Sequence, residues 1–363
     1  MSISLLFAAG DVGGARALIP IIEFAASVGH DVFTLRHSYL AQNADLTTSW
    51  IDPPDADNTE QQEKLIKGIN PDVMIFGSSL KDSLPLAFAR AAQRLGIKVI
   101  HVLDSWAAYT LRMNIDNRGS FVPDIYTAMD QIAVDAAVRE GIFPQSLRIT
   151  GQPSLSNMLE RYSEVYSTQR ADQKPDKLRL LFISEPASSD QGVSAEDATY
   201  RGYTEIEVLE LLCNALQPLW EHVFISILPH PRENPKSVGA VWERSRGKLQ
   251  GIILPQGLKK APLETIDAVI GMASILLYEC WLLGIPVLSL QPGMIQENLG
   301  QFGYRDGLKL IDSYDNAQET IRSWIDSIEP GKLPEPLQEA KVHARAPQRI
   351  MDIALELTRN KNQ

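Results

Sequence analysis

Short apolar runs alternate with amphipathic stretches along most of this chain, and this alternation limits the folds it can adopt. In the first half, the predicted strands are 3–8, 31–35, 47–51, 73–76, 99–102 and 148–150. The predicted helices between them are 15–28, 60–67, 84–95 and 131–140. Several helices are expected to end at a glycine just past the last turn, at Gly29, Gly68, Gly96 and Gly141. Such a strand–helix–strand order predicts a mostly parallel sheet with helices on both faces.

The same alternation starts again in the second half. Its predicted strands are 178–183, 223–228, 252–254, 268–270, 287–290 and 308–310, and its predicted helices are 204–216, 236–246, 274–283 and 316–328. The polar stretch 163–177 shows no apolar periodicity and is predicted to be a linker. We therefore expect an α/β protein with two Rossmann-like domains, at 1–165 and 176–330, followed by a further helical segment at 335–360.

Composition excludes several classes of function. Apolar residues make up 44% and charged residues 22% of the chain, as in an average soluble protein, and the formal charge is −11. That charge argues against nucleic acid as a partner and against bulk binding to an anionic membrane, because both need a basic surface. It leaves room for a local pocket that binds a phosphate.

The location of the protein is predicted from three features. The apolar start lacks a basic segment and is too short for a signal peptide. Cys213 and Cys280 lie in apolar helical stretches and are interpreted as buried thiols rather than a disulfide, which suits a reducing cytoplasm. The apolar stretch 268–290 carries Glu279 and is interrupted by glycines and Pro286, so a strand, a helix and a second strand explain it better than a membrane span. We expect a cytoplasmic protein.

The glycine-rich turn at 10–14 follows the first strand and precedes a helix. Glycines allow a ligand to approach the backbone closely, and a helix start offers N–H groups to an anion. The spacing is not the dinucleotide fingerprint G-x-G-x-x-G, and no acidic residue ends the second strand, so an NAD enzyme is disfavoured. Gly13 and Gly14 are candidates for phosphate contact, and the alternative is a tight structural turn.

Polar residues also follow the later strands of the first half. Asp104 follows an apolar strand and is a candidate acid or base, as is Asp11, although Asp104 equally suits a helix cap. Candidates for an acceptor-binding surface come next, although core packing is an equal alternative for the tryptophan: Trp106, Tyr109 and Arg112.

Two stretches of the second half carry the candidate donor site. His230 lies between two prolines at the end of a strand, near Arg232, in a pattern suited to binding a diphosphate or a base. Ser274 starts a helix, and Glu279 is a carboxylate in an otherwise apolar helix, which is costly unless it has a partner such as ribose hydroxyls or an internal donor. The full set of donor candidates is Gly13, Gly14, Ser184, Glu185, His230, Arg232, Gly271, Met272, Ser274 and Glu279.

The second stretch resembles the donor-site signature of GT-B glycosyltransferases: Gly271-x-x-Ser274, then Glu279, then Gly284-x-Pro286 and an apolar strand. The resemblance implies that Glu279 holds the nucleotide ribose and that the helix start at Ser274 faces the phosphates. It also implies that the polar loop Gln296, Glu297 and Asn298 touches the transferred sugar. It further implies two domains facing each other across a cleft, with a C-terminal helix that crosses back to the first domain.

Two other families share shorter motifs. His230-Pro231 with Ser274 resembles the motifs of bacterial sialyltransferases and CDP-glycerol-type polymer transferases, in which the His and Ser contact a cytidine nucleotide. The first half resembles UDP-GlcNAc 2-epimerases through Pro71-Asp72-Val73, His101-Val102 and residues 150–153. The acidic residues of those epimerases would fall near Ser78 and Leu103, which cannot carry protons in the same way.

The leading hypothesis is a glycosyltransferase of surface polysaccharide assembly that uses a nucleotide-sugar donor and a glycan or small-molecule acceptor. Asp11 or Asp104 would be the base, and His230 would help to stabilise the leaving phosphate. The six histidines are scattered, so no metal and no other cofactor is expected. Peripheral association with a membrane is compatible with this role, and no oligomeric state is indicated. Two alternatives stay open: an epimerase or sugar-nucleotide hydrolase, and a binding module without catalysis.

Overall fold

The computed structural model describes residues 2–43, 45–156, 158–159, 162, 175–255, 263–295, 305–332 and 335–359. The chain divides into two compact units. The first is formed by residues 1–160 together with 338–363, and the second by residues 161–337. Most of the predicted linker, 163–174, lies outside the described residues.

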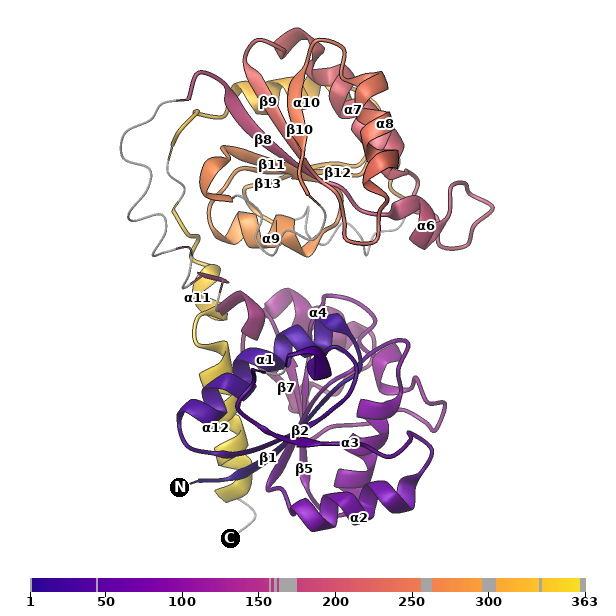
Figure 1. Ribbon diagram of the computed structural model, residues 1–363, viewed down its shortest axis with the longest axis vertical. Helices are drawn as coiled ribbons and strands as arrows, with labels where there is room; N and C mark the ends of the chain where they lie inside the picture. The colour runs from indigo at the N-terminus through magenta and orange to yellow at the C-terminus, as the bar shows by residue number, and fades with distance from the viewer. Residues whose placement is uncertain are drawn as a thin grey trace. The chain divides into compact units, whose positions relative to one another are not determined.

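The first unit is built on a parallel sheet of seven strands (Figure 1). Its strands, in chain order, are β1 (Ser4–Ala9), β2 (Asp31–Leu35), β3 (Ser49–Ile51), β4 (Val73–Gly77), β5 (Lys98–Val102), β6 (Ile125–Ala128) and β7 (Leu147–Ile149). They lie in the order β3-β2-β1-β4-β5-β6-β7. Most residues of the inner strands are buried because helices cover both faces of the sheet.

The sheet of the first unit is covered by helices that follow its strands and by one from the C-terminal segment. They are α1 (Val12–Ser27), α2 (Thr59–Ile69), α3 (Leu84–Arg94), α4 (Gln131–Arg139) and α12 (Ala346–Arg359). Helices α1 and α12 pack together on one face, and α2 and α3 lie together on the other (Figure 1). The apolar side of α12, with Ile350, Met351 and Ala354, belongs to the same core as α1 and β1.

The C-terminal segment is also bonded to the loop after β7. The backbone N–H of Gln152 donates to Nδ1 of His343 at 3.0 Å, and Nε of Arg349 donates to the carbonyl of Thr150 at 2.9 Å. His343 lies in α11 (Ala340–His343), a single turn that precedes α12. The expectation that the last helix returns to the first unit is therefore confirmed.

The second unit repeats the architecture with a parallel sheet of six strands. They are β8 (Leu178–Ile183), β9 (Val223–Leu228), β10 (Gln250–Ile253), β11 (Ala268–Gly271), β12 (Val287–Leu290) and β13 (Leu308–Ile311), in the order β10-β9-β8-β11-β12-β13. Its helices are α6 (Ala187–Gln191), α7 (Glu205–Leu216), α8 (Pro235–Ser245), α9 (Ile275–Leu282) and α10 (Ala317–Asp326). Helices α7, α8 and α10 share one core with the sheet, and α9 covers the other face (Figure 1). Both units are thus Rossmann-like.

The structure corrects three local predictions. Helix α2 continues through Gly68 to Ile69 and is capped by Asn70, which takes the left-handed conformation with φ 52°. The segment predicted to be helical at 335–360 contains two helices, at 340–343 and 346–359, because Arg345 between them has a left-handed φ of 60°. Strand β6 was not predicted, since its four residues include Tyr126 and Thr127 and form no clear apolar run.

Candidate functional site

Each sheet has one point where the chain reverses the direction in which it adds strands. In the first sheet this point lies between β1 and β4, where Ala9 pairs with Gly77, and in the second between β8 and β11, where Ile183 pairs with Gly271. Open α/β sheets bind ligands outside the carboxyl ends of their strands at such points. Each unit therefore has one preferred place for a ligand.

The glycine-rich turn after β1 is closely packed by the chain's own carboxylates. Asp11 caps α1, with Oδ1 accepting from the N–H of Gly14 at 2.8 Å. A Cβ on Gly13 would come within 2.0 Å of Oδ2 of Asp104, so any other residue there would displace this carboxylate. The start of α1 thus faces two carboxylates. The closeness of Asp104 gives a structural reason for glycine at position 13, and phosphate contact by Gly13 and Gly14 stays a prediction.

Asp104 is paired with Arg112 in a nearly buried position. Nη1 of Arg112 donates to Oδ1 of Asp104 at 2.7 Å, Nη2 donates to Oγ of Ser105 at 2.5 Å, and Nε donates to the carbonyl of Ala107 at 3.0 Å. Burial raises the pKa of Asp104 from its ordinary value, against the opposing attraction of Arg112. The pair suits a fixed internal ion pair, because removing either partner would leave a buried charge unpaired.

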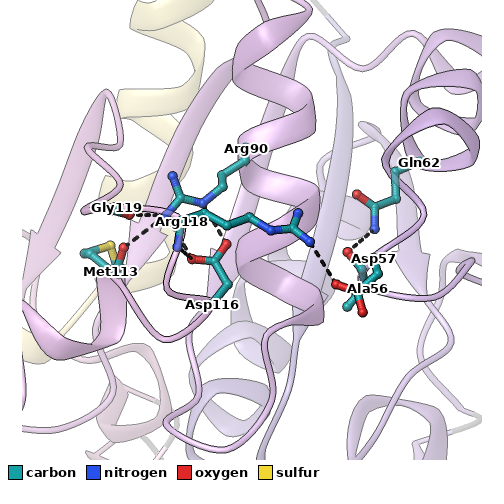
Figure 2. A network of polar contacts seen from close by, with 8 residues as sticks. All are labelled: Ala56, Asp57, Gln62, Arg90, Met113, Asp116, Arg118 and Gly119. Atoms are coloured by element: carbon teal, nitrogen blue, oxygen red, sulfur yellow. Dashed lines mark hydrogen bonds and ion pairs between the residues drawn. The ribbon is translucent and has the colours of Figure 1, made fainter.

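A polar network holds the loop that carries Arg112 (Figure 2). Arg90 of α3 donates to both carboxylate oxygens of Asp116, at 2.8 and 3.0 Å, and also to the carbonyl of Gly119. Arg118 extends this network to Asp57 at 2.8 Å. The loop is therefore anchored on α3, which restricts where the side chain of Arg112 can lie.

Two candidates for an acceptor surface are buried within the first unit. Trp106 is 4% exposed, and its Nε1 donates to the carboxylate of Asp130 at 3.0 Å. Tyr109 is fully buried, and its carbonyl accepts from the hydroxyl of Tyr126. Burial raises the pKa of the Tyr109 hydroxyl. Both side chains are therefore packed inside the first unit.

The structure brings together a histidine and a carboxylate that sequence reasoning missed. Nε2 of His37 lies 2.5 Å from Oδ2 of Asp82, with the two side chains 31% and 25% exposed. His37 follows β2, and Asp82 lies in the turn between β4 and α3. The order β2-β1-β4 brings these two strand ends to either side of β1. That order was the only signal that would have paired them.

In the second unit, His230 is held at the end of β9 by a short network. Oε2 of Glu233 accepts from the backbone N–H of His230 at 2.6 Å, and Oε1 accepts from Oγ of Ser184 at 2.7 Å. Nδ1 of His230 accepts from the N–H of Arg232 at 3.2 Å, so a neutral ring carries its proton on Nε2. Burial and the neighbouring Arg232 lower the pKa of His230, which favours this neutral form.

Arg232 is exposed and makes a two-pronged ion pair. Its Nη1 and Nη2 each donate to a carboxylate oxygen of Asp190 in α6 at 2.6 Å. The side chain of Arg232 is 60% exposed, and this pairing raises its pKa. Solvent-exposed ion pairs contribute little net free energy, so an anionic ligand could compete with Asp190 for the guanidinium.

The strand-reversal point of the second sheet lies at the start of α9. Oε2 of Glu185, after β8, accepts from the N–H of Ala273 at 2.6 Å, and burial raises the pKa of this carboxyl. Ser289 donates to the carbonyl of Met272 at 2.6 Å, and both are buried, as is Gly271. Ser274 caps α9 by accepting from the N–H of Leu276. The turn before α9 is thus fixed by groups from β8 and β12.

Glu279 lies in α9 and is partly buried. Burial raises the pKa of the adjacent Cys280 thiol, and the charge of Glu279 raises it further. Cys213 and Cys280 are both buried free thiols. The sugar-contact candidates Gln296, Glu297 and Asn298 lie outside the described residues.

A cavity of about 500 Å³ opens beside the His230 network. Its lining includes Ser184, Ser188, Glu205, Arg232, Glu233 and Asn234. This volume lies within the range of small-molecule sites in proteins. Among the described residues, no group of three or more His, Cys, Asp or Glu side chains is placed to hold a metal ion. None of the described helices is long and apolar enough to span a membrane.

Comparison with known proteins identifies the fold. No protein-family model and no curated protein sequence matches the chain. Among solved structures, it is similar to UDP-GlcNAc 2-epimerase from Neisseria meningitidis bound to UDP-GlcNAc, at 13% identity and TM-score 0.60, over 97% of this chain and 100% of that one. The UDP-N-acetylglucosamine 2-epimerase of Rickettsia bellii gives 14% and 0.60, over 100% and 98%. HepE from Anabaena, in complex with UDP-glucose, gives 12% and 0.54, over 99% of both chains.

At these identities the likeness establishes the fold alone. The chain has a GT-B-like fold made of two Rossmann-like units with a C-terminal helix that packs on the first, so the predicted fold class is confirmed.

Proposed function

We propose that the protein is an enzyme that binds a nucleotide-sugar and transfers its sugar to an acceptor hydroxyl. The observation that carries the proposal is the network of Ser184, Glu233 and His230 at the carboxyl edge of the second sheet. It fixes a neutral histidine with an Nε2–H donor beside an exposed arginine. Neighbouring structures of the same fold were solved with UDP-GlcNAc and UDP-glucose, which supports the same ligand class here.

The donor would be held by groups of the second unit. His230 would donate from Nε2 to a phosphate oxygen, and Arg232 would exchange Asp190 for the diphosphate. The helix start at Ser274 would add backbone N–H groups. Glu279 would accept from ribose hydroxyls. Glu185 already occupies the N–H of Ala273, so we assign it the role of shaping the turn rather than that of a phosphate ligand.

In the proposed reaction, the acceptor oxygen forms a bond to the anomeric carbon as the bond from that carbon to the phosphate oxygen breaks. The nucleoside diphosphate leaves with the electron pair, stabilised by His230, Arg232 and the start of α9. The acceptor proton passes to a base of the enzyme. Asp11 and Asp104 remain candidates for that base, but Asp11 caps α1 and Asp104 is bound to Arg112.

A UDP-sugar 2-epimerase is the second candidate, because solved epimerases share the fold. The side chains near the positions of the epimerase carboxylates do not support it. Ser78 is buried and its Oγ lies 2.8 Å from Nε2 of His101, while Leu103 is apolar and 1% exposed. Neither can exchange a proton with a sugar carbon in the way a carboxylate does.

Binding and product analysis test the proposal. Titration calorimetry with UDP, CDP, UDP-glucose and UDP-GlcNAc would identify a ligand. His230→Ala and Glu279→Ala should each weaken its Kd about tenfold or more, which corresponds to about 1.4 kcal/mol. His222→Ala is the control, since His222 is exposed just before β9, at the opposite edge of the sheet.

Product analysis then separates the two activities. A transferase consumes donor only when an acceptor is added, whereas an epimerase converts UDP-GlcNAc to its C2 epimer alone, which NMR detects. Unchanged affinity in both variants would refute the assigned donor site. Epimer formation without an acceptor would establish the second candidate instead.

A further inference from the structure

A single peptide group in the second unit, just before α9, is held from both sides. The carbonyl of Met272 and the N–H of Ala273 belong to this group, which is planar and trans, so they point in opposite directions. Oγ of Ser289 donates to the carbonyl at 2.6 Å, and Oε2 of Glu185 accepts from the N–H at 2.6 Å. The peptide group therefore cannot rotate without breaking both hydrogen bonds. The next residue is Ser274, which caps α9.

The two bonds come from the two strands that flank β11. Glu185 follows β8, and Ser289 lies in β12, directly opposite the last residue of β11. Met272 and Ser289 are fully buried, whereas Ala273 and Ser274 are partly exposed. A ligand can therefore reach the start of α9 but not the serine hydroxyl that holds the peptide group before it.

A buried chain of side-chain hydrogen bonds supports Ser289. The hydroxyl of Tyr203 donates to Oε1 of Gln291 at 3.0 Å, and Nε2 of Gln291 donates to Oγ of Ser289 at 2.9 Å. All three side chains are at most 1% exposed. Burial raises the pKa of the Tyr203 hydroxyl, which therefore stays protonated and able to donate. Because each group donates to the next, the chain orients the hydroxyl of Ser289 towards the carbonyl that it holds.

The backbone fixes the far end of this chain as well. Tyr203 ends the long loop between α6 and α7. A Cβ on Gly202 would come within 1.8 Å of the carbonyl oxygen of Gly293, and the N–H of Ile295 donates to the carbonyl of Arg201 at 3.0 Å. The loop is thus joined to the turn after β12. Apolar side chains would fill the same space without the cost of burying polar groups, so packing alone does not account for the chain.

We propose that Ser289 is a positioning residue of the donor site and that Gln291 and Tyr203 act through it. The inference rests on the proposed function, in which Ser274 and Glu279 bind the nucleotide. Both of these groups belong to α9, and the fixed peptide group determines where α9 begins. The donor groups are thereby held in place before the ligand arrives, which reduces the cost of ordering them on binding.

The test measures nucleotide affinity by titration calorimetry, with UDP and CDP as probes. Ser289→Ala should weaken the Kd about fivefold or more, which corresponds to about 1 kcal/mol, the net contribution of one hydrogen bond. Tyr203→Phe should weaken it about two- to threefold, because Gln291 still donates to Ser289. The double variant should match Ser289→Ala alone, because the tyrosine hydroxyl acts only through the serine.

Tyr126→Phe is the matched control. It removes a tyrosine hydroxyl that is equally buried and also donates to an oxygen atom, but in the first unit, where the carbonyl of Tyr109 accepts it at 3.3 Å. Its Kd should stay within about twofold of the wild-type value. Thermal melting shows whether each variant is folded at the temperature of the titration. If Ser289→Ala does not fold, the comparison of Tyr203→Phe with Tyr126→Phe carries the test.

The results that would overturn the proposal are distinguishable from failure of the proposed function. A folded Ser289→Ala variant whose Kd stays within twofold of the wild-type value refutes the positioning role and leaves nucleotide binding standing. Effects that multiply in the double variant refute the action of Tyr203 through Ser289. An equal loss of affinity in Tyr126→Phe assigns the effect to general destabilisation. A wild-type protein that binds no nucleotide refutes the proposed function, and the role of Ser289 falls with it.

Discussion

Breaking the ion pair between Arg90 and Asp116 should destabilise the first unit strongly. Asp116 is 6% exposed and accepts two bonds from Arg90, which is itself 15% exposed. In Asp116→Ala the guanidinium would keep the carbonyl of Gly119 but lose its counter-ion. Removing one partner of a buried pair costs about 3–5 kcal/mol. Because Arg90 retains carbonyl acceptors and lies over the Phe121 ring, we expect the lower end, about 3 kcal/mol.

Two measurements would detect this loss. For a domain of this size, 3 kcal/mol lowers the melting temperature by about 6–12 °C. The slowest backbone amides of the first unit exchange with solvent only when that unit unfolds. Their hydrogen exchange should therefore accelerate about a hundredfold when the free energy of unfolding falls by about 3 kcal/mol. Calorimetry alone is insufficient, because a protein with two compact units need not unfold in a single transition.

A double variant and a surface control complete the experiment. Arg90→Met with Asp116→Ala removes both charges and keeps most of the volume of the Arg90 side chain, so it should be markedly more stable than Asp116→Ala alone. Asp52→Ala removes the partner of Arg36 in a pair whose side chains are 53% and 87% exposed, and it should change stability by less than about 1 kcal/mol. The reasoning fails if Asp116→Ala costs no more than this control, or if the double variant recovers nothing.

Two further predictions concern stability. Gly68 lies inside α2, and a Cβ there would meet no atom within 4 Å. Gly68→Ala should therefore raise the free energy of unfolding, measured in urea, by about 0.5–1 kcal/mol. A loss of stability would contradict the helical geometry at this position. Asp267 is desolvated, but its bonds from Arg179 and from the N–H of Gly331 outweigh that burial and hold its pKa below the ordinary value. Its stabilising contribution is present above the pKa of the unfolded chain and is lost as pH falls through the folded pKa, so Asp267→Asn should flatten the decline in stability below about pH 4. If stability falls equally steeply with pH in Asp267→Asn, the decline is caused by other titrating groups.

The fold could be predicted from local patterns because each unit repeats the same alternation of strand and helix. Strands such as β8 and β9 match their predicted bounds, since each is apolar apart from one residue, Arg179 in β8 and Ser226 in β9. The predictions failed where tertiary contacts, rather than the local sequence, decide whether a strand forms or where a helix ends. Strand β6 has too few apolar residues to be recognised, and Asn70 rather than Gly68 ends α2 because amphipathic packing continues through the glycine.

The candidate site could be predicted only where its residues follow one another in sequence. The surroundings of His230 are local, since Glu233 lies three residues away. The pair of His37 and Asp82 joins residues 45 positions apart, and it exists because β2 and β4 flank β1. The partner of Asp104 is close in sequence, but only the fold shows that the pair is packed against Gly13.

The return of α12 to the first unit has a consequence for biosynthesis. Ile350, Met351 and Ala354 complete a core whose other members come mostly from the first 125 residues. The second unit is contiguous in sequence and is finished before α12 emerges from the ribosome. The usual order of folding along a nascent chain is therefore reversed in its last step. Until α12 has been synthesised, the apolar surface of α1 that it covers is open to chaperones, so the core of the first unit is completed only after the second unit has been made.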